Sequence, residues 1–123
     1  QNEGRKILHS PDLMVNCTCV RVPVYRSHSE SITIETEKEI TPEKARELLS
    51  KAAGVKLMDD LENQKYPMPL DTSEQDLIYV GRIRKDISKE NSLALWCSGD
   101  QVRKGAATNA VQIAEVLVRE NLI

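Results

Sequence analysis

The stretch LIYVGRIRKDISKENSLALWCS, residues 77–98, decides the fold. Residues 77–87 and 92–98 are rich in aliphatic, β-branched and aromatic side chains, and each has the length of a strand. Lys89, Glu90 and Asn91 lie between them as a short polar connection. Because strands joined by so short a connection pair antiparallel, the stretch predicts a β-hairpin.

Three further strands are predicted upstream of the hairpin. In the two longer ones, valines or isoleucines alternate with other residues, so each strand would turn one apolar face toward a core. The predicted strands span residues 15–25, 29–36 and 55–58. Residues 59–74 are polar and contain two prolines, so they are predicted to form a loop over the surface.

Helix signals separate these strands. Thr41 can cap a helix, Pro42 suits the first helical position, and Glu43 suits the first turn. Gly54 suits the end of that helix.

Both ends of the chain also read as helical. Residues 2–8 resemble the last turns of a helix that ends at Ser10-Pro11. Residues 104–121 form a longer helix that is apolar on several faces, which predicts that another domain packs against it.

This order of elements, with several strands and few crossover helices, predicts an α+β fold. We expect a mixed, mostly antiparallel sheet covered by helices. The 123 residues fit a single domain, residues 1–123.

Composition excludes several classes of protein. Hydrophobic residues make up 40% of the chain and charged residues 29%, as in ordinary soluble domains. A formal net charge of −2 argues against nucleic acid as a partner, because such binding depends on neutralising phosphates. No apolar run approaches the roughly 20 residues that span a bilayer, so no membrane association is expected.

The cysteines are Cys17, Cys19 and Cys97. An odd number of cysteines at irregular spacing does not predict a disulfide framework. Cys17 and Cys19 lie close enough to share a metal, but they have too few further ligands for a zinc site, so we expect no metal. A reducing, cytoplasmic location is the simplest interpretation. Cys17 and Cys19 are expected to be small buried apolar residues of the strand over 15–25.

The stretch RVPVYRSHSE, residues 21–30, carries the chemistry. The guanidinium of Arg21 can hold a carboxylate through two parallel hydrogen bonds. The imidazole of His28 can move protons near neutral pH, because its reference pKa is about 6.5. A strand arginine and a strand-end histidine are also common as structural or surface residues, so the pair alone leaves both readings open.

The spacing of the two residues adds a geometric condition. On one straight strand, Arg21 and His28 would lie roughly 23 Å apart on opposite faces. They can share a small substrate only if the chain bends between them. Pro23 and the Arg26-Ser27 pair make a bend between Val24 and His28 plausible.

Three ordered runs resemble the aspartate-semialdehyde dehydrogenases. They are TCVRVPVYRSHSE at residues 18–30, VGRIRKD at 80–86, and DQ at 100–101 followed by KGAATNAVQIAE at 104–115. Together they extend across nearly the whole chain. The resemblance is to the C-terminal catalytic and dimerisation domain, whose fold is shared with glyceraldehyde-phosphate dehydrogenases.

The resemblance implies an NADP-dependent oxidoreductase. The reaction would convert aspartyl 4-phosphate to L-aspartate 4-semialdehyde and phosphate, in lysine, methionine and threonine biosynthesis. Arg21 would bind the substrate carboxylate, and His28 would be the catalytic acid and base. Asn109 would contact the cofactor, as Gln101 would in the enterobacterial type. The enzyme would be a homodimer.

The chain departs from that family in what it lacks. It has no Gly-rich turn of the kind that binds nucleotides, so the N-terminal Rossmann domain and its cysteine nucleophile are expected to be absent. Asn16-Cys17-Thr18 imitates the nucleophile's sequence but lies just before the Arg21 strand, where the family has none. The chain alone would then be inactive. The alternative is a self-contained α+β module that uses Arg21 for an anion and has no use for His28.

Overall fold

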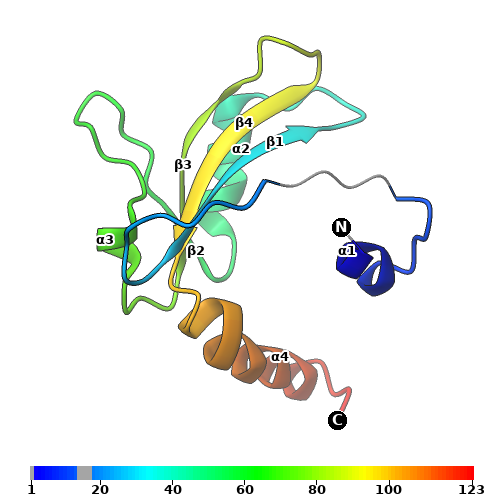
Figure 1. Ribbon diagram of the computed structural model, residues 1–123. Helices are drawn as coiled ribbons and strands as arrows, with labels where there is room; N and C mark the ends of the chain where they lie inside the picture. The colour runs from blue at the N-terminus through cyan, green and yellow to red at the C-terminus, as the bar shows by residue number, and fades with distance from the viewer. Residues whose placement is uncertain (1, 14–17) are drawn as a thin grey trace.

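A four-stranded sheet forms the centre of the computed structural model, which describes residues 2–13 and 18–123 (Figure 1). The strands lie in the order β1-β4-β3-β2. β1 (His28–Glu35) and β3 (Ile78–Lys85) pair antiparallel with β4 (Ser92–Gly99), while β2 (Val55–Leu57) pairs parallel with β3. The predicted hairpin and the mixed, mostly antiparallel sheet are therefore confirmed.

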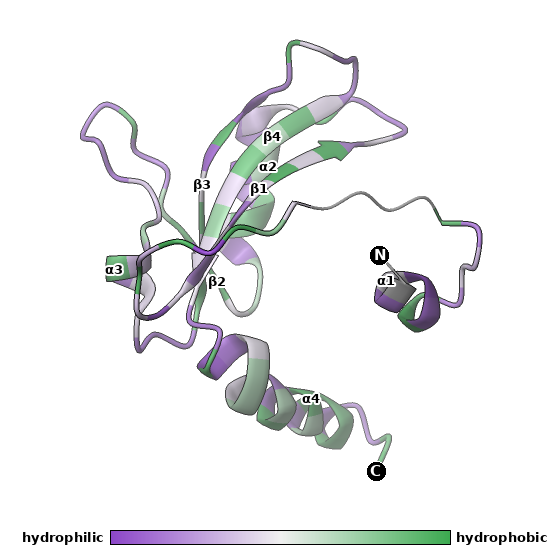
Figure 2. Ribbon diagram, in the orientation of Figure 1, coloured by the Kyte–Doolittle hydropathy of each residue, from purple (hydrophilic) through white to green (hydrophobic). Residues whose placement is uncertain are grey.

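Helix α2 (Pro42–Lys51) supplies the apolar face that closes the core. Its predicted cap forms, because the Thr41 hydroxyl accepts a hydrogen bond from the Lys44 N–H at 3.2 Å. Ala45 packs into a cluster with residues of β3 and β4, and Ile83 at its centre is only 1% exposed. Figure 2 shows the apolar residues distributed along the strands and α2. The predicted glycine stop is displaced: Ala52 is the C-terminal cap, and Gly54 follows with φ of 77°.

Gly81 of β3 lies directly against the backbone of a neighbouring segment. A Cβ atom placed there would lie 2.0 Å from the carbonyl oxygen of Met58 and 2.8 Å from Cδ of Pro67. The register of β3 against β4 shifts just after this position, between Gly81 and Arg84. Backbone, rather than a flexible side chain, therefore excludes any larger residue.

We expect Gly81→Ala to lower the free energy of unfolding by about 3 kcal/mol, the upper end of ordinary overpacking. Gly4→Ala is the matched control, because a Cβ there meets nothing within 4 Å and alanine favours the helix α1 (Asn2–Ile7). Urea denaturation followed by Trp96 fluorescence measures both. Equal stability for the two variants would contradict the close approach seen at Gly81.

The prediction of a strand over residues 15–25 is wrong for residues 18–25, the part that the structure describes. Residues 18–25 are irregular and pair with no strand, and Val20, Val22 and Val24 are exposed. Pro23 cannot donate to a strand ladder, and the Val24 N–H instead donates to the Val22 carbonyl at 2.8 Å in a tight turn. Residues 15–17 of this prediction, with Cys17, lie outside the described residues.

Two other predicted segments need correction. The surface loop over 59–74 contains the short helix α3 (Pro69–Thr72), and Pro67 and Thr72 are buried. The last helix begins with a wider turn, η1 (Arg103–Ala107), which is interrupted where Ala106 adopts φ of −141°. The regular helix α4 (Thr108–Arg119) follows it.

Helix α4 carries its apolar side chains on the surface. It runs away from the sheet (Figure 1), and none of its residues is buried; Val111, Ile113, Val116 and Val118 are all exposed. The prediction that another domain packs against this helix stays a prediction. None of the described helices is long and apolar enough to cross a membrane.

Candidate functional site

The chain bends sharply just before β1. Bends at Tyr25 and Arg26 are followed by Ser27, whose φ of 75° lies in the left-handed region, and β1 starts at His28. In Figure 1 the segment before β1 passes toward α3 and then turns back into the strand. The structure thus contains the bend that the spacing of Arg21 and His28 requires.

An ion pair between the half-buried Arg26 and the buried Asp100 anchors this bend. Nη2 of Arg26 lies 2.7 Å from Oδ2 of Asp100, and Nη1 lies 3.2 Å from Oε1 of Glu74. The Asp100 carboxylate is 0% exposed and also accepts hydrogen bonds from the N–H groups of Glu74 and Val102, at 2.7 and 2.9 Å. Burial by itself raises the pKa of Asp100, but these two N–H groups and the Arg26 charge outweigh it, so the pKa is lowered overall.

Ser27 and His28 are held by a second set of hydrogen bonds. The Ser27 N–H donates to Oε1 of Gln101 at 2.7 Å, and the Ser27 hydroxyl accepts from the Thr72 hydroxyl at 2.9 Å. The Thr72 and Ser98 hydroxyls are 3.0 Å apart, and Ser98 also donates to the His28 carbonyl at 3.2 Å. The backbone on both sides of the bend is therefore fixed from α3, β4 and the Gln101 turn.

His28 lines a pocket of about 130 Å³. The other lining residues come from β1, β3, β4, the turn after β4 and η1, and are Glu30, Ile78, Cys97, Gly99, Asp100, Gln101 and Gly105. The volume is well below the roughly 300–1,000 Å³ of pockets for drug-sized ligands. The described residues thus suit a substrate of few atoms and do not enclose a dinucleotide.

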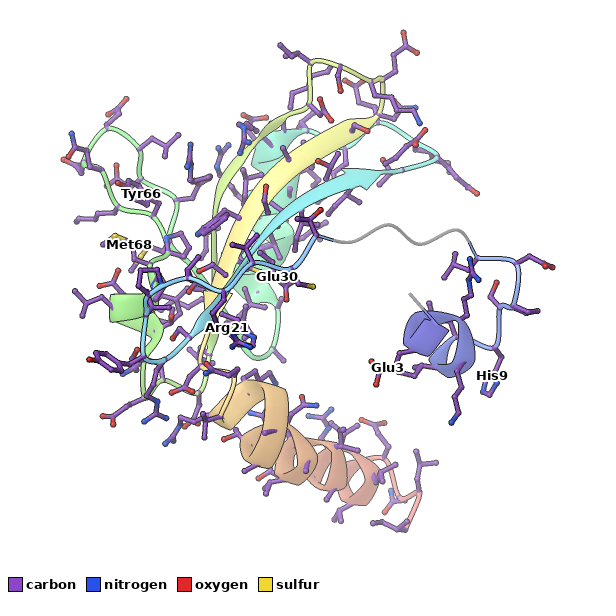
Figure 3. The ribbon with its side chains drawn as sticks, viewed as in Figure 1. Glu3, His9, Arg21, Glu30, Tyr66 and Met68 are labelled. Atoms are coloured by element: carbon purple, nitrogen blue, oxygen red, sulfur yellow. The ribbon has the colours of Figure 1, made fainter. Side chains whose placement is uncertain are left out.

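The structure places the three predicted site residues differently. His28 lines the pocket, whereas Arg21 and Asn109 are outside its lining. Arg21 is exposed in the irregular segment, and Figure 3 shows it in the same part of the view as Glu30. Asn109 is half-buried in the first turn of α4. Convergence of Arg21 and His28 on one substrate therefore stays a prediction.

The two arginines of the motif have different surroundings. The charge of Arg26 is neutralised by Asp100 and Glu74 through its two Nη atoms, while its buried Nε has no hydrogen-bond partner among the described residues. Arg21 forms no ion pair with any residue in the described ranges 2–13 and 18–123. Of the two, Arg21 is the one available to a carboxylate from solution.

The surroundings of Cys97 disfavour a role as nucleophile. Burial, followed by the nearby Glu30 charge, raises the pKa of the Cys97 thiol, which disfavours the reactive thiolate. Cys19 is exposed, so the expectation of a buried strand residue is wrong; the segment it belongs to is not a strand.

Within the described residues, no group of three or more His, Cys, Asp or Glu side chains could hold a metal ion.

Asp100 and Thr72 were missed as parts of this site. Asp100 stands in the DQ run at residues 100–101, so its motif was visible, but its pairing with Arg26 spans 74 positions of the chain. Thr72 lies in a segment that resembled a plain loop, where no sequence signal indicated burial.

Comparison with protein families and curated proteins confirms the family resemblance seen in the sequence. Residues 1–104 match the family described as "Semialdehyde dehydrogenase, dimerisation domain". The chain is 56% identical over 121 residues to the aspartate-semialdehyde dehydrogenase of Aquifex aeolicus, covering 98% of this chain and 36% of that protein. It is 59% identical over 114 residues to that of Campylobacter jejuni, covering 93% and 33%. The chain thus spans about a third of the length of these relatives.

Solved structures share the fold as well as the sequence. Aspartate semialdehyde dehydrogenase II from Vibrio cholerae matches with a TM-score of 0.81 and 45% identity, over 95% of this chain and 34% of that chain. The same enzyme complexed with ASA matches with a TM-score of 0.82 and 45% identity, over the same shares of both chains. With the family match over residues 1–104, these likenesses show that the chain belongs to the semialdehyde dehydrogenase family and corresponds to its dimerisation domain.

Proposed function

We propose that this chain contributes the substrate-binding and acid–base side of an NADP-dependent aspartate-semialdehyde dehydrogenase. The full-length enzyme would convert aspartyl 4-phosphate to L-aspartate 4-semialdehyde and phosphate, a step toward lysine, methionine and threonine. The observation that carries the proposal is the His28 pocket at a bend that is anchored by Arg26, together with an exposed Arg21 seven residues earlier in the chain.

Arg21 would bind the α-carboxylate of the substrate. Its guanidinium is exposed and forms no ion pair within the described part of the chain, so a ligand carboxylate displaces no protein partner. A planar guanidinium matches a carboxylate through two parallel hydrogen bonds, which fixes the substrate's orientation as well as its charge.

His28 would be the acid–base residue. It lies exposed at the first position of β1 and faces a pocket of a few atoms' volume. In the proposed reaction it would hold and release the proton of the hydroxyl that forms at the substrate carbonyl. The raised pKa of Cys97 disfavours it as the nucleophile, and from the family resemblance the nucleophilic thiol would come from parts of the enzyme outside this chain.

The cofactor and the partner follow from the same proposal. The pocket does not enclose a dinucleotide, so NADP would be bound mainly by residues outside this chain. Asn109 would be the residue of this chain that contacts the cofactor. Without that part, the chain alone would be inactive. The family's description as a dimerisation domain supports a homodimer, and the free thiols of Cys19 and Cys97 fit the reducing cytoplasm.

An activity assay on the full-length protein tests the proposal. Purified protein is mixed with L-aspartate 4-semialdehyde, inorganic phosphate and NADP⁺, and NADPH is followed by its absorbance. We expect NADPH formation that depends on both the semialdehyde and phosphate. A folded full-length protein that forms no reduced nucleotide under these conditions would contradict the proposal.

A further inference from the structure

The buried Asp100 carboxylate connects segments that are far apart in the chain. It binds Arg26 from the bend, the N–H of Glu74 just after α3, and the N–H of Val102 ahead of η1. The backbone carbonyl of Asp100 also accepts hydrogen bonds from the N–H groups of Arg103 and Lys104. No substrate role has been assigned to this carboxylate, although the residue lines the His28 pocket.

These contacts converge on the peptide that leads into His28. Asp100 holds Arg26 from one side, and its neighbour Gln101 accepts the Ser27 N–H at 2.7 Å. Ser27 is a non-glycine residue at φ of 75°, a conformation that persists only where the surroundings impose it. If the bend relaxed, the backbone at His28 would rotate and its imidazole would change orientation relative to the pocket.

We propose that Asp100 is a positioning residue for the His28 imidazole. It holds Arg26 and the Gln101 turn, and these together fix the left-handed Ser27 linkage from which His28 enters the pocket. The kinetic consequence rests on the proposed function, because it assumes that His28 transfers a proton. The positional consequence concerns the fold of this chain alone.

Asp59 provides a matched control elsewhere in the fold. Its carboxylate is equally buried, lies 2.7 Å from Nε of Arg46, and accepts the Ile83 N–H at 3.3 Å. It thus repeats the arginine and backbone partners of Asp100, but it is outside the lining of the His28 pocket. Asp59→Asn should therefore match the loss of stability of Asp100→Asn without its effect on His28.

Histidine NMR of the full-length protein tests the positional claim. The His28 imidazole Cε1–Hε1 signal is assigned by its loss in His28→Ala. We expect Asp100→Asn to displace this signal clearly, and Asp59→Asn to leave it in place. Gln101→Ala, which removes only the acceptor of the Ser27 N–H, should displace it too, and it carries the test if Asp100→Asn does not fold. An unmoved His28 signal in the folded variants overturns the proposal.

A double-mutant cycle tests the kinetic claim. Asp100→Asn should lower kcat about 10-fold, within the range that small misplacements of reacting groups cost. In the His28→Ala background the same change should lower kcat less than about 2-fold, because residues that act through one another are not additive. An equal loss in both backgrounds would show that Asp100 acts elsewhere and overturn the proposal. If the full-length protein lacked dehydrogenase activity, the proposed function would fail, and the NMR comparison would still decide the position of His28.

Discussion

Replacing His28 with alanine in the full-length protein should lower kcat by about 10²-fold or more, the usual contribution of general acid–base catalysis. The imidazole lines a pocket at the start of β1, and it is the one described histidine that does so. Because the proton moves only during the reaction, the KM for the semialdehyde should change little. Steady-state kinetics at saturating phosphate and NADP⁺ measures both constants.

His9→Ala is the control for this experiment. His9 is exposed at the end of α1 and is not among the residues that line the pocket, so its removal should leave kcat unchanged. Near wild-type kcat for His28→Ala at neutral pH would contradict the acid–base role. The histidine would then be a structural residue of the strand end.

Arg21→Lys should raise the KM for aspartate semialdehyde by roughly 10-fold to 10²-fold. This range corresponds to the loss of about 1.5–3 kcal/mol, the usual contribution of a hydrogen bond to a charged group. Lysine keeps the positive charge but loses the planar pair of donors that matches a carboxylate. Since that contact is made in the ground state as well as the transition state, kcat should fall much less than kcat/KM. Initial rates over a range of semialdehyde concentrations separate the two effects.

The matched control is Arg119→Lys. Arg119 is an exposed arginine of α4 whose partner is the neighbouring Glu120, and it lies outside the pocket lining. Its replacement should leave both constants unchanged. A variant Arg21→Lys with a wild-type KM would assign the substrate carboxylate to another residue.

The elements with strong local signals were predictable from the sequence. Thr41-Pro42-Glu43 marked the start of α2 to within one residue, because capping and first-turn preferences are local properties. The β3–β4 hairpin followed from two apolar runs around a short polar turn. The family followed from three ordered motifs and agrees with the match over residues 1–104.

Features set by long-range pairing were not predictable in the same way. Residues 18–25 alternate like a strand, yet they pair with no strand, and a propensity for strand cannot supply a partner. Thr72 is buried by contacts with Ser27 and Ser98, which are distant in the sequence. Likewise, nothing local in the chain indicated that Arg26, rather than Arg21, would be neutralised by Asp100.

The most direct test of the account is a crystal structure of the full-length protein with L-aspartate 4-semialdehyde bound. The account predicts that the substrate lies in the His28 pocket, with its α-carboxylate held by two hydrogen bonds from Arg21. The His28 imidazole should lie within about 2.6–3.2 Å of the carbonyl oxygen, the reach of a general acid or base. A substrate bound elsewhere, or Arg21 and His28 directed to opposite faces of the sheet beyond the reach of one four-carbon molecule, would contradict it.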